Sequence, residues 1–168
     1  MMNFSSPEQN IERLHLRSGM VVADLGAGSG HYSIIIGKKL KEMGGGGTVY
    51  AVDVQKHYLD AIKQEADKNG LGNVRVIWGD IDVLGGTKLA DNLADAVVIS
   101  NVLFQSEHKK DFLAEASRIL KPGGEMLIID WQSKIKPQDI LSILPPGVSK
   151  TSEFDAGSHH FGILFRKS

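Results

Sequence analysis

The chain has 168 residues, of which 42% are hydrophobic and 23% charged, a balance that is ordinary for a soluble globular protein and predicts one domain. A formal net charge of −1 and the lack of an apolar run of about 18 residues give no indication of nucleic-acid or membrane binding. The absence of cysteine excludes disulfides, thiolate metal sites and cysteine nucleophiles, and it fits a protein of the reducing cytoplasm.

A helix over residues 7–17 is the first predicted element. Ser6 can cap this helix, and Pro7 suits its first position. Ile11 and Leu14 would both face the core. We expect the helix to lie beside the first strand and to cover part of a ligand site.

A buried strand over residues 20–23 leads into the stretch that organises the chain. The strand ends at Asp24, and a helical pattern begins soon afterwards at His31. Between them, glycine stands at every second position: Gly26, Gly28 and Gly30. Strand, glycine turn and helix in this order open a nucleotide site in a doubly wound sheet, because the missing side chains let a ligand approach the backbone.

The spacing of these glycines distinguishes between nucleotide ligands. A dinucleotide fingerprint reads G-x-G-x-x-G and would place its third glycine at position 31. This chain has His31 there and carries G-x-G-x-G instead. The spacing argues against a dinucleotide, and a tight turn that binds no ligand is the remaining alternative.

The second predicted strand, residues 48–53, ends in an acid that fits a nucleotide site. It follows a helix that runs to about Met43 and a loose connection of four glycines. Asp53 lies 23 residues after Gly30, close to the spacing at which an acid holds the ribose hydroxyls of a nucleotide. A carboxylate suits this task because it only accepts hydrogen bonds. The alternative is an exposed loop acid.

The third predicted strand, residues 74–78, follows an amphipathic helix that closes at residues 69–70. At its carboxyl end stand Gly79, Asp80 and Ile81. Asp80 could accept a hydrogen bond from an adenine amine at that position, although a plain turn aspartate is the alternative.

After a polar loop, the fourth predicted strand covers residues 96–100, and residues 101–105 follow it at the same crevice. Ser106 can cap the next helix. Residues 122–123, Pro-Gly, suit the centre of a type II turn. The fifth predicted strand, residues 126–131, comes directly after this turn.

The tail differs from the alternating part of the chain. Residues 137–144 allow a short helix of two turns, and residues 150–154 and 161–166 predict an antiparallel hairpin. His159 and His160 are neighbours on a strand and would point to opposite faces, so we predict no metal site.

The pattern as a whole resembles the class I S-adenosylmethionine-dependent methyltransferases over residues 10–166. Two stretches carry the resemblance: VADLGAGSG at residues 22–30, which is quite specific, and RILKPGG at residues 118–124, which is typical of the small-molecule branch. The resemblance implies an α/β fold with a Rossmann-like, doubly wound, seven-stranded sheet in the order 3-2-1-4-5-7-6. Helices would cover both faces, and only strand 7 would be antiparallel.

The same resemblance implies one methyltransferase domain over residues 1–168. An N-terminal helix would occupy residues 1–18, and the cofactor-binding core residues 19–131. A short helix and the closing hairpin would occupy residues 132–168.

S-adenosylmethionine is the cofactor that the resemblance implies. The residues implied to bind it lie in the glycine turn and at the strand ends: Asp24, Gly26, Ala27, Gly28, Gly30, Tyr32, Asp53, Val54, Gly79, Asp80, Ile81, Ser100 and Asn101. Asp24, Gly26 and Gly28 would line the methionine portion. Tyr32 would close over the sulfonium, with packing in the core as its alternative role.

The adenosine portion would meet the ends of the second and third strands. Asp53 would hold the ribose hydroxyls, and Val54 would pack on the adenine. Asp80 would meet the adenine amine, and the backbone of Ile81 a ring nitrogen. The backbone of residues 100–101 would meet the methionine amino group.

The methyl acceptor is not identified by these residues, because the sulfonium methyl is already activated and its transfer needs mainly alignment. A general base is needed only if the acceptor is protonated, so no catalytic residue is assigned. Asn101 is not followed by Pro-Pro, so the signature of amino-group methylation on bases or glutamine is missing. The lack of cysteine excludes chemistry like that of the arsenite methyltransferases. The candidates for the acceptor side, each with an alternative as a surface or packing residue, are His31, Gln105, Trp131 and Gln132.

Three functions remain open from the sequence. The favoured one is methyl transfer to a small-molecule or peptide-sized acceptor. The first alternative is an S-adenosylmethionine-binding module that needs a partner chain, or a second copy of itself, for activity. The second alternative is an NAD-dependent oxidoreductase. The short tail predicts an open acceptor side, which a sizeable acceptor or a partner chain would have to cover.

Overall fold

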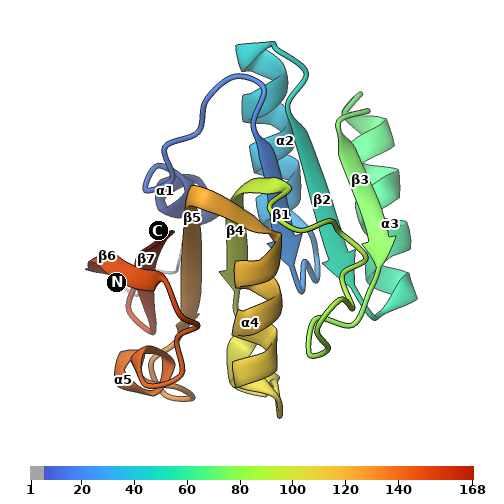
Figure 1. Cartoon of the computed structure of the whole chain (residues 1–168). Helices are drawn as coiled ribbons and strands as arrows, with labels where there is room; N and C mark the ends of the chain where they lie inside the picture. Colours follow the sequence, from blue (N-terminus) through green and yellow to red (C-terminus); the bar gives the residue numbers. More distant parts are fainter. Residues whose placement is uncertain (1–5) are drawn as a thin grey trace.

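A computed structural model describes residues 6–168 of the chain. Seven strands form one sheet in the order β3-β2-β1-β4-β5-β7-β6, in which β7 alone runs antiparallel to its neighbours (Figure 1). The predicted strand order and the direction of the seventh strand are confirmed. The elements are α1 (Pro7–Ile11), β1 (Val21–Leu25), α2 (His31–Met43), β2 (Thr48–Asp53), α3 (Lys56–Lys68), β3 (Val74–Trp78), β4 (Ala94–Ser100), the 3₁₀ turn η1 (Leu103–Gln105), α4 (Lys109–Ile119), β5 (Leu120–Trp131), α5 (Pro137–Leu141), β6 (Val148–Asp155) and β7 (His160–Lys167).

Helices cover both faces of the sheet, as predicted. The apolar runs of β1, β2 and β4 are buried on both sides, which is typical of parallel strands between two helix layers. On one face, α1 and α2 pack through Ile11, Ile36 and Leu40. On the other face, α4 and α5 pack through residues such as Phe112 and Ile140.

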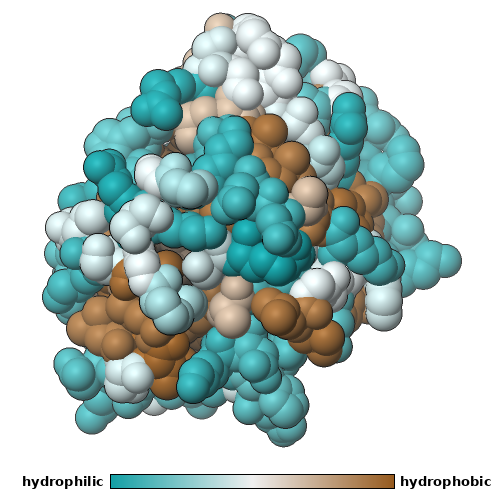
Figure 2. Space-filling view, in the orientation of Figure 1, coloured by the Kyte–Doolittle hydropathy of each residue, from teal (hydrophilic) through white to brown (hydrophobic). Residues whose placement is uncertain are grey.

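One face of the molecule is largely hydrophilic in Figure 2. A hydrophobic area at its lower left lies where Figure 1 draws α5. Leu141, Ile143 and Leu144, which are only partly buried, pack against the core there. None of the helices formed by residues 6–168 combines the length and the apolar character needed to cross a membrane.

The N-terminal helix is shorter than predicted. Helix α1 ends at Ile11, whereas the expected helix continued to residue 17; residues 1–5 lie outside the described part of the chain. Ser6 does cap α1, and both Ile11 and Leu14 are buried as expected. The chain leaves the helix because the His15 N–H donates to Glu125 Oε1 at 3.2 Å, and its Nδ1 lies 2.9 Å from the same oxygen. This contact with the middle of β5 replaces the next helical turns.

Several further boundaries differ from the prediction; strand β1, for example, runs to Leu25, and β4 begins at Ala94. Helix α4 begins at Lys109, and Ser106 does not cap it; instead, the Ser106 hydroxyl donates to Asp82 Oδ1 at 2.6 Å. The Pro-Gly turn at residues 122–123 lies inside β5 as an irregularity, so that this strand begins at Leu120. Helix α5 ends at Leu141 rather than at residue 144.

The register of the parallel strands brings the predicted site residues together. Leu25 of β1 pairs with Val52 of β2, and the N–H groups of Gly26 and Ala27 both donate to the Val52 carbonyl, at 2.8 and 3.1 Å. The glycine turn therefore continues the pairing beyond β1. Asp53, the next residue of β2, lies beside this turn.

Candidate functional site

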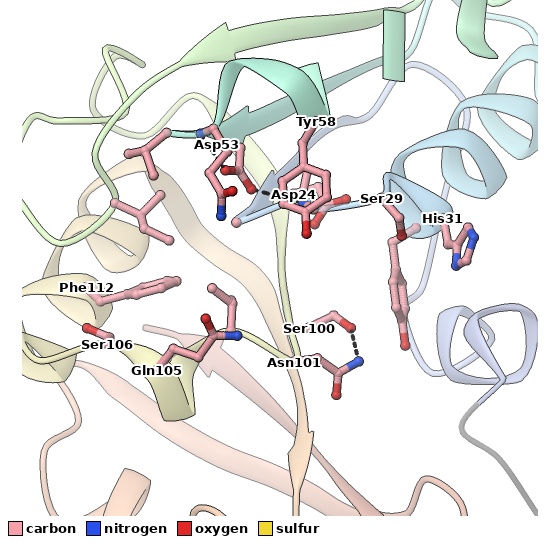
Figure 3. A pocket seen from close by; sticks show the side chains of 18 of the residues that line it. Asp24, Ser29, His31, Asp53, Tyr58, Ser100, Asn101, Gln105, Ser106 and Phe112 are labelled. Carbon is pink, nitrogen blue, oxygen red and sulfur yellow. Dashed lines mark hydrogen bonds between the residues drawn. The ribbon is translucent and has the colours of Figure 1, made fainter. Parts of the chain in front are cut away.

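A cavity of about 390 Å³ lies at the carboxyl ends of β1, β2 and β4 (Figure 3). All residues predicted to bind the cofactor line this cavity except Gly30 and Gly79. Of the acceptor-side candidates, His31 and Gln105 line it as well, whereas Trp131 and Gln132 do not. Its volume is within the range of small-molecule sites.

The three glycines of the turn have different tasks. A Cβ atom on Gly26 would lie 2.7 Å from the Val102 side chain, and one on Gly30 would lie 2.5 Å from Ile62, so both positions are needed for packing. A Cβ on Gly28 would have no neighbour closer than 4.0 Å, because it would project toward the cavity that Gly28 lines. The backbone of Gly28 also has φ +53°, a conformation that other residues adopt with strain. Gly28 therefore leaves space for a ligand, whereas its two neighbours allow the turn to pack.

Asp53 joins the glycine turn to the start of α3. Its Oδ2 accepts from the Gly28 N–H at 3.0 Å, and its Oδ1 accepts from the Gln55 N–H at 2.9 Å. The residue is only 7% exposed and still lines the cavity. Each carboxylate oxygen has a second lone pair, so Asp53 can accept further hydrogen bonds from a pair of ligand hydroxyls.

Asp24 gives the cavity a buried acid. The Ser33 hydroxyl donates to its Oδ2 at 2.7 Å. Burial raises the pKa of Asp24 to about 6, against the lowering effect of the hydrogen bonds from Ser33, and the charge of Asp53 adds to the rise. Asp24 is therefore largely ionised at pH 7 but becomes neutral in mildly acidic solution.

The wall next to α1 contains Tyr32, which is buried and lines the cavity. The side-chain amide of Asn10 donates to the Tyr32 hydroxyl at 2.9 Å. Pro7, also in α1, lines the cavity directly. The first turn of the N-terminal helix therefore borders the cavity.

The end of β4 contributes Ser100 and Asn101. Asn101 has φ +56°, an unusual conformation for a residue other than glycine, and its N–H donates to the Ile129 carbonyl at 2.8 Å. Its side-chain Nδ2 donates to the Ser100 hydroxyl at 3.2 Å, and its buried Oδ1 accepts no hydrogen bond within residues 6–168. A ligand that donates a hydrogen bond would satisfy this oxygen.

The predicted site residues that do not line the cavity have packing roles, and that of Gly30 is described above. A Cβ on Gly79 would lie 2.6 Å from the Gly86 carbonyl oxygen, so this glycine allows a close backbone contact. The Trp131 ring lies against the His160 ring with centroids 4.1 Å apart, and Gln132 Nε2 donates to the His160 carbonyl at 3.0 Å. Trp131 and Gln132 therefore belong to the junction between β5 and β7.

Several lining residues were not predicted. Tyr58 extends from α3 into the cavity, and Phe112 of α4 provides an apolar wall (Figure 3). Gln55 precedes α3 and also lines the cavity. Tyr58 lies in the first turns of the helix that follows Asp53, a position from which a side chain can reach the same strand end. Phe112 is fully buried in the core, and the face of α4 that carries it also borders the cavity. Within residues 6–168, no group of three or more His, Asp or Glu is arranged to hold a metal ion.

Comparisons with known proteins agree on one family. A family model described as a methyltransferase domain matches residues 16–160. An arsenite methyltransferase of Aquipseudomonas alcaligenes is 34% identical over 119 residues, which cover 68% of this chain and 34% of that protein. A ubiquinone/menaquinone biosynthesis C-methyltransferase, UbiE, of Francisella philomiragia is 29% identical over 131 residues, which cover 77% of this chain and 50% of that protein. The chain thus spans between about a third and a half of these relatives.

Solved structures show the same similarity. The crystal structure of a SAM-dependent methyltransferase from Aquifex aeolicus matches with a TM-score of 0.84 and 26% identity, over 98% of this chain and 91% of that chain. TrmN from Thermus thermophilus shares the fold with a TM-score of 0.80 and 23% identity, over 96% of this chain and 48% of that one.

Proposed function

Since the chain belongs to the class I S-adenosylmethionine-dependent methyltransferases, we propose that it transfers the methyl group of S-adenosylmethionine to a small-molecule or peptide-sized acceptor. The observation that carries this proposal is the gap left by Gly28 beside the carboxylate of Asp53. Both residues line a cavity of about 390 Å³, and the gap would be filled by any larger side chain. The residues present therefore fit the cofactor of the family.

The residues of this chain would hold the cofactor in two portions. Asp53 would accept the ribose hydroxyls, while Val54 and Asp80 would meet the adenine from the ends of β2 and β3. Asp24 would face the cationic methionine portion. When bound, S-adenosylmethionine supplies an electrophilic methyl group. The protein then contributes mainly alignment and exclusion of water, which do not need a catalytic acid or base.

The acceptor side is the less complete part of the site. Within the part of the chain that the structure describes, no residue after Phe112 lines the cavity. Residues 132–168, which form α5 and the hairpin of β6 and β7, therefore do not line the cavity. This supports an acceptor large enough to cover the site itself, or a partner chain that completes it.

One relative is named an arsenite methyltransferase, but we do not propose arsenite as the acceptor of this chain. Trivalent arsenic is a soft ion that prefers thiolate ligands, and this chain has no cysteine.

His31 and Gln105, which line the cavity, are the residues we propose to meet the acceptor.

The choice of cofactor is tested by calorimetric titration of the purified chain. S-adenosylhomocysteine should bind with a dissociation constant in the micromolar range, and NAD should show no comparable binding. The physical reason is the spacing of the glycine turn, in which His31 replaces the third glycine of a dinucleotide site. Tighter binding of NAD than of S-adenosylhomocysteine would refute the proposed function.

The affinity for S-adenosylmethionine should depend on pH through Asp24. The ligand carries a sulfonium charge that attracts the ionised carboxylate, so the affinity should rise as the pH passes upward through the pKa of about 6. If only the ionised form binds, the affinity at pH 5 is roughly tenfold weaker than at pH 7.

Two comparisons separate the titration of Asp24 from a nonspecific effect of low pH on the protein. S-adenosylhomocysteine lacks the sulfonium charge and should show a smaller change over the same pH range. Asp24→Asn, which does not ionise, should flatten the profile for S-adenosylmethionine. An unchanged profile in this variant would show that another group is responsible.

A further inference from the structure

The wall of the cavity near β3 is formed by a loop without helix or strand. Residues 79–93 connect β3 to β4, and Asp80, Ile81 and Asp82 of this loop line the cavity. A few backbone hydrogen bonds form within this loop, among them those from the Gly86 N–H to the Val83 carbonyl and from the Lys88 N–H to the Gly85 carbonyl. Contacts from α4 to residues 85 and 87 add to these internal bonds.

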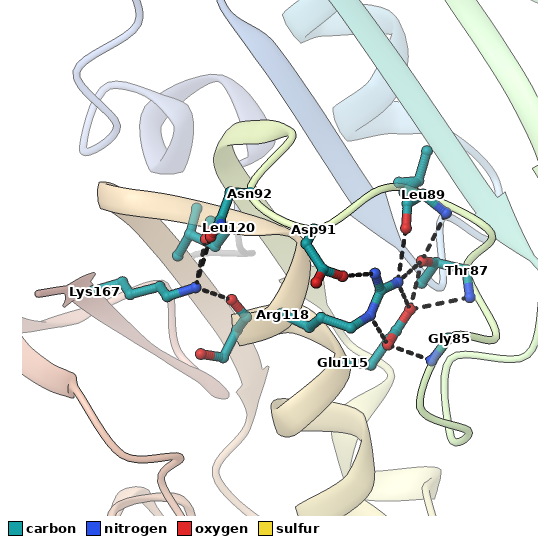
Figure 4. Close-up of polar contacts among 10 residues, drawn as sticks. Gly85, Thr87, Leu89, Asp91, Asn92, Glu115, Arg118, Leu120 and Lys167 are labelled. Atoms are coloured by element: carbon teal, nitrogen blue, oxygen red, sulfur yellow. Dashed lines mark hydrogen bonds and ion pairs between the residues drawn. The ribbon is translucent and has the colours of Figure 1, made fainter.

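The main contact is the carboxylate of Glu115, in the middle of α4. Glu115 is fully buried, and its side chain faces the loop (Figure 4). Its Oε2 accepts from the Gly85 N–H at 2.7 Å. Its Oε1 accepts from the Thr87 hydroxyl at 2.6 Å and from the Thr87 N–H at 3.2 Å. One side chain of a helix thus satisfies three donors of an irregular loop.

Arg118 completes this network from the next turn of α4. Its guanidinium donates to both oxygens of Glu115, at 2.8 and 2.7 Å, a bidentate geometry that is among the strongest between side chains. It also donates to the Leu89 carbonyl at 2.8 Å and to Asp91 Oδ1 at 2.6 Å. Burial alone would raise the pKa of Glu115, but the hydrogen bonds from Arg118, Thr87 and Gly85 lower it to about 2. Glu115 is therefore ionised at neutral pH.

The segment held by Glu115 lies directly against the cavity wall. The Asp80 N–H donates to the Gly86 carbonyl at 3.1 Å. A Cβ atom on Gly86 would collide with the Asp80 carbonyl oxygen, so the two backbones touch without a side chain between them. On the cavity side, the Ser106 hydroxyl donates a hydrogen bond to Asp82 Oδ1. A shift of residues 85–87 would consequently move Asp80.

We propose that Glu115 and Arg118 are positioning residues that hold the adenine side of the cofactor site through residues 85–87 and Asp80. Neither of them lines the cavity, so they act through the loop and not on the ligand. The inference rests on the proposed function, because it assigns the adenine to the wall formed by Asp80.

Glu115→Gln tests this proposal with almost no change in shape. The new amide has a donor where the carboxylate has an acceptor, and that donor would face the N–H groups of Gly85 and Arg118 or of Thr87. Hydrogen–deuterium exchange of the ligand-free protein should become faster in residues 80–87. The dissociation constant for S-adenosylhomocysteine should rise roughly tenfold.

Glu125→Gln is the matched control. Glu125 is also a buried carboxylate, and it contacts His15 and Arg166, but it lies in the middle of β5 and does not line the cavity. The control variant should lower the melting temperature without changing the exchange of residues 80–87 or the affinity. Equal losses of affinity in the two variants would overturn the proposal, as would a folded Glu115→Gln protein with unchanged exchange in the loop.

A second variant covers the case in which Glu115→Gln does not fold. Thr87→Val removes the hydroxyl, which donates to Glu115 and accepts from the Leu89 N–H and from Arg118, and Thr87→Ser retains it. The valine variant should show the faster exchange and weaker binding, and the serine variant should restore both. Exchange is measured without ligand, so the role of the network in holding the loop is tested even if S-adenosylhomocysteine does not bind. In that case, only the proposed function fails.

Discussion

Gly28→Val should abolish measurable binding of S-adenosylmethionine and S-adenosylhomocysteine while the chain still folds. The valine side chain would occupy the cavity, since a Cβ at this position has no neighbour closer than 4.0 Å and Gly28 lines the site. The φ of +53° adds strain of about 1–2 kcal/mol for a residue with a side chain, which is small beside the stability of about 5–15 kcal/mol typical of a domain. Calorimetry with S-adenosylhomocysteine and a thermal melt measure both effects.

Gly46→Val separates strain from steric exclusion. Gly46 also has a positive φ, +75°, and a Cβ atom there would meet nothing within 4 Å, but it lies in the connection between α2 and β2 and does not line the cavity. This variant should melt at a similarly lowered temperature and bind the ligand normally. Normal binding by a folded Gly28→Val protein would place the ligand elsewhere.

Asp53→Ala should weaken cofactor binding by about 1–3 kcal/mol, the range for hydrogen bonds to a charged group, which is roughly five- to 150-fold in the dissociation constant. The substitution removes the acceptor proposed for the ribose hydroxyls. It also leaves the N–H groups of Gly28 and Gln55 without the carboxylate that they contact in the structure. Both effects act on the same end of the site and should appear together in a titration with S-adenosylhomocysteine.

Asp155→Ala provides the control for this second variant. Asp155 is also an aspartate at the end of a strand, and its Oδ1 accepts from the Gly157 N–H at 2.9 Å, but it does not line the cavity. Its replacement should leave the dissociation constant unchanged. If Asp53→Ala binds as tightly as the parent chain, Asp53 does not hold the ribose.

The glycine turn and the strand ends line the cavity, and the sequence indicated them as the candidate site. Their positions follow from local sequence: the apolar run before Asp24, the spacing of the glycines, and an acid at the tip of the next strand. The order of the strands came from the family resemblance, because periodicity alone does not say which strands are neighbours. The roles assigned to the individual site residues stay predictions that the variants above would test.

The differences arose where a residue depends on a partner far away in the sequence. Helix α1 ends early because His15 contacts Glu125, 110 residues further on. Ser106 was expected to cap a helix, but its hydroxyl meets Asp82 of another loop. Trp131 and Gln132 stand at the end of β5, yet their contacts with His160 hold them outside the cavity.

The sequence by itself determined the alternation of strands and helices, the glycine turn and the acids at the strand ends, because short-range patterns of apolar and small residues specify these features. Only the tertiary structure decided which side chains complete the cavity and what holds them. Tyr58 and Phe112 reach the site from two different helices, and Glu115 of α4 satisfies donors 28 and 30 residues earlier in the chain. Such contacts form when the sheet brings distant segments together, and no local pattern in the sequence specifies them.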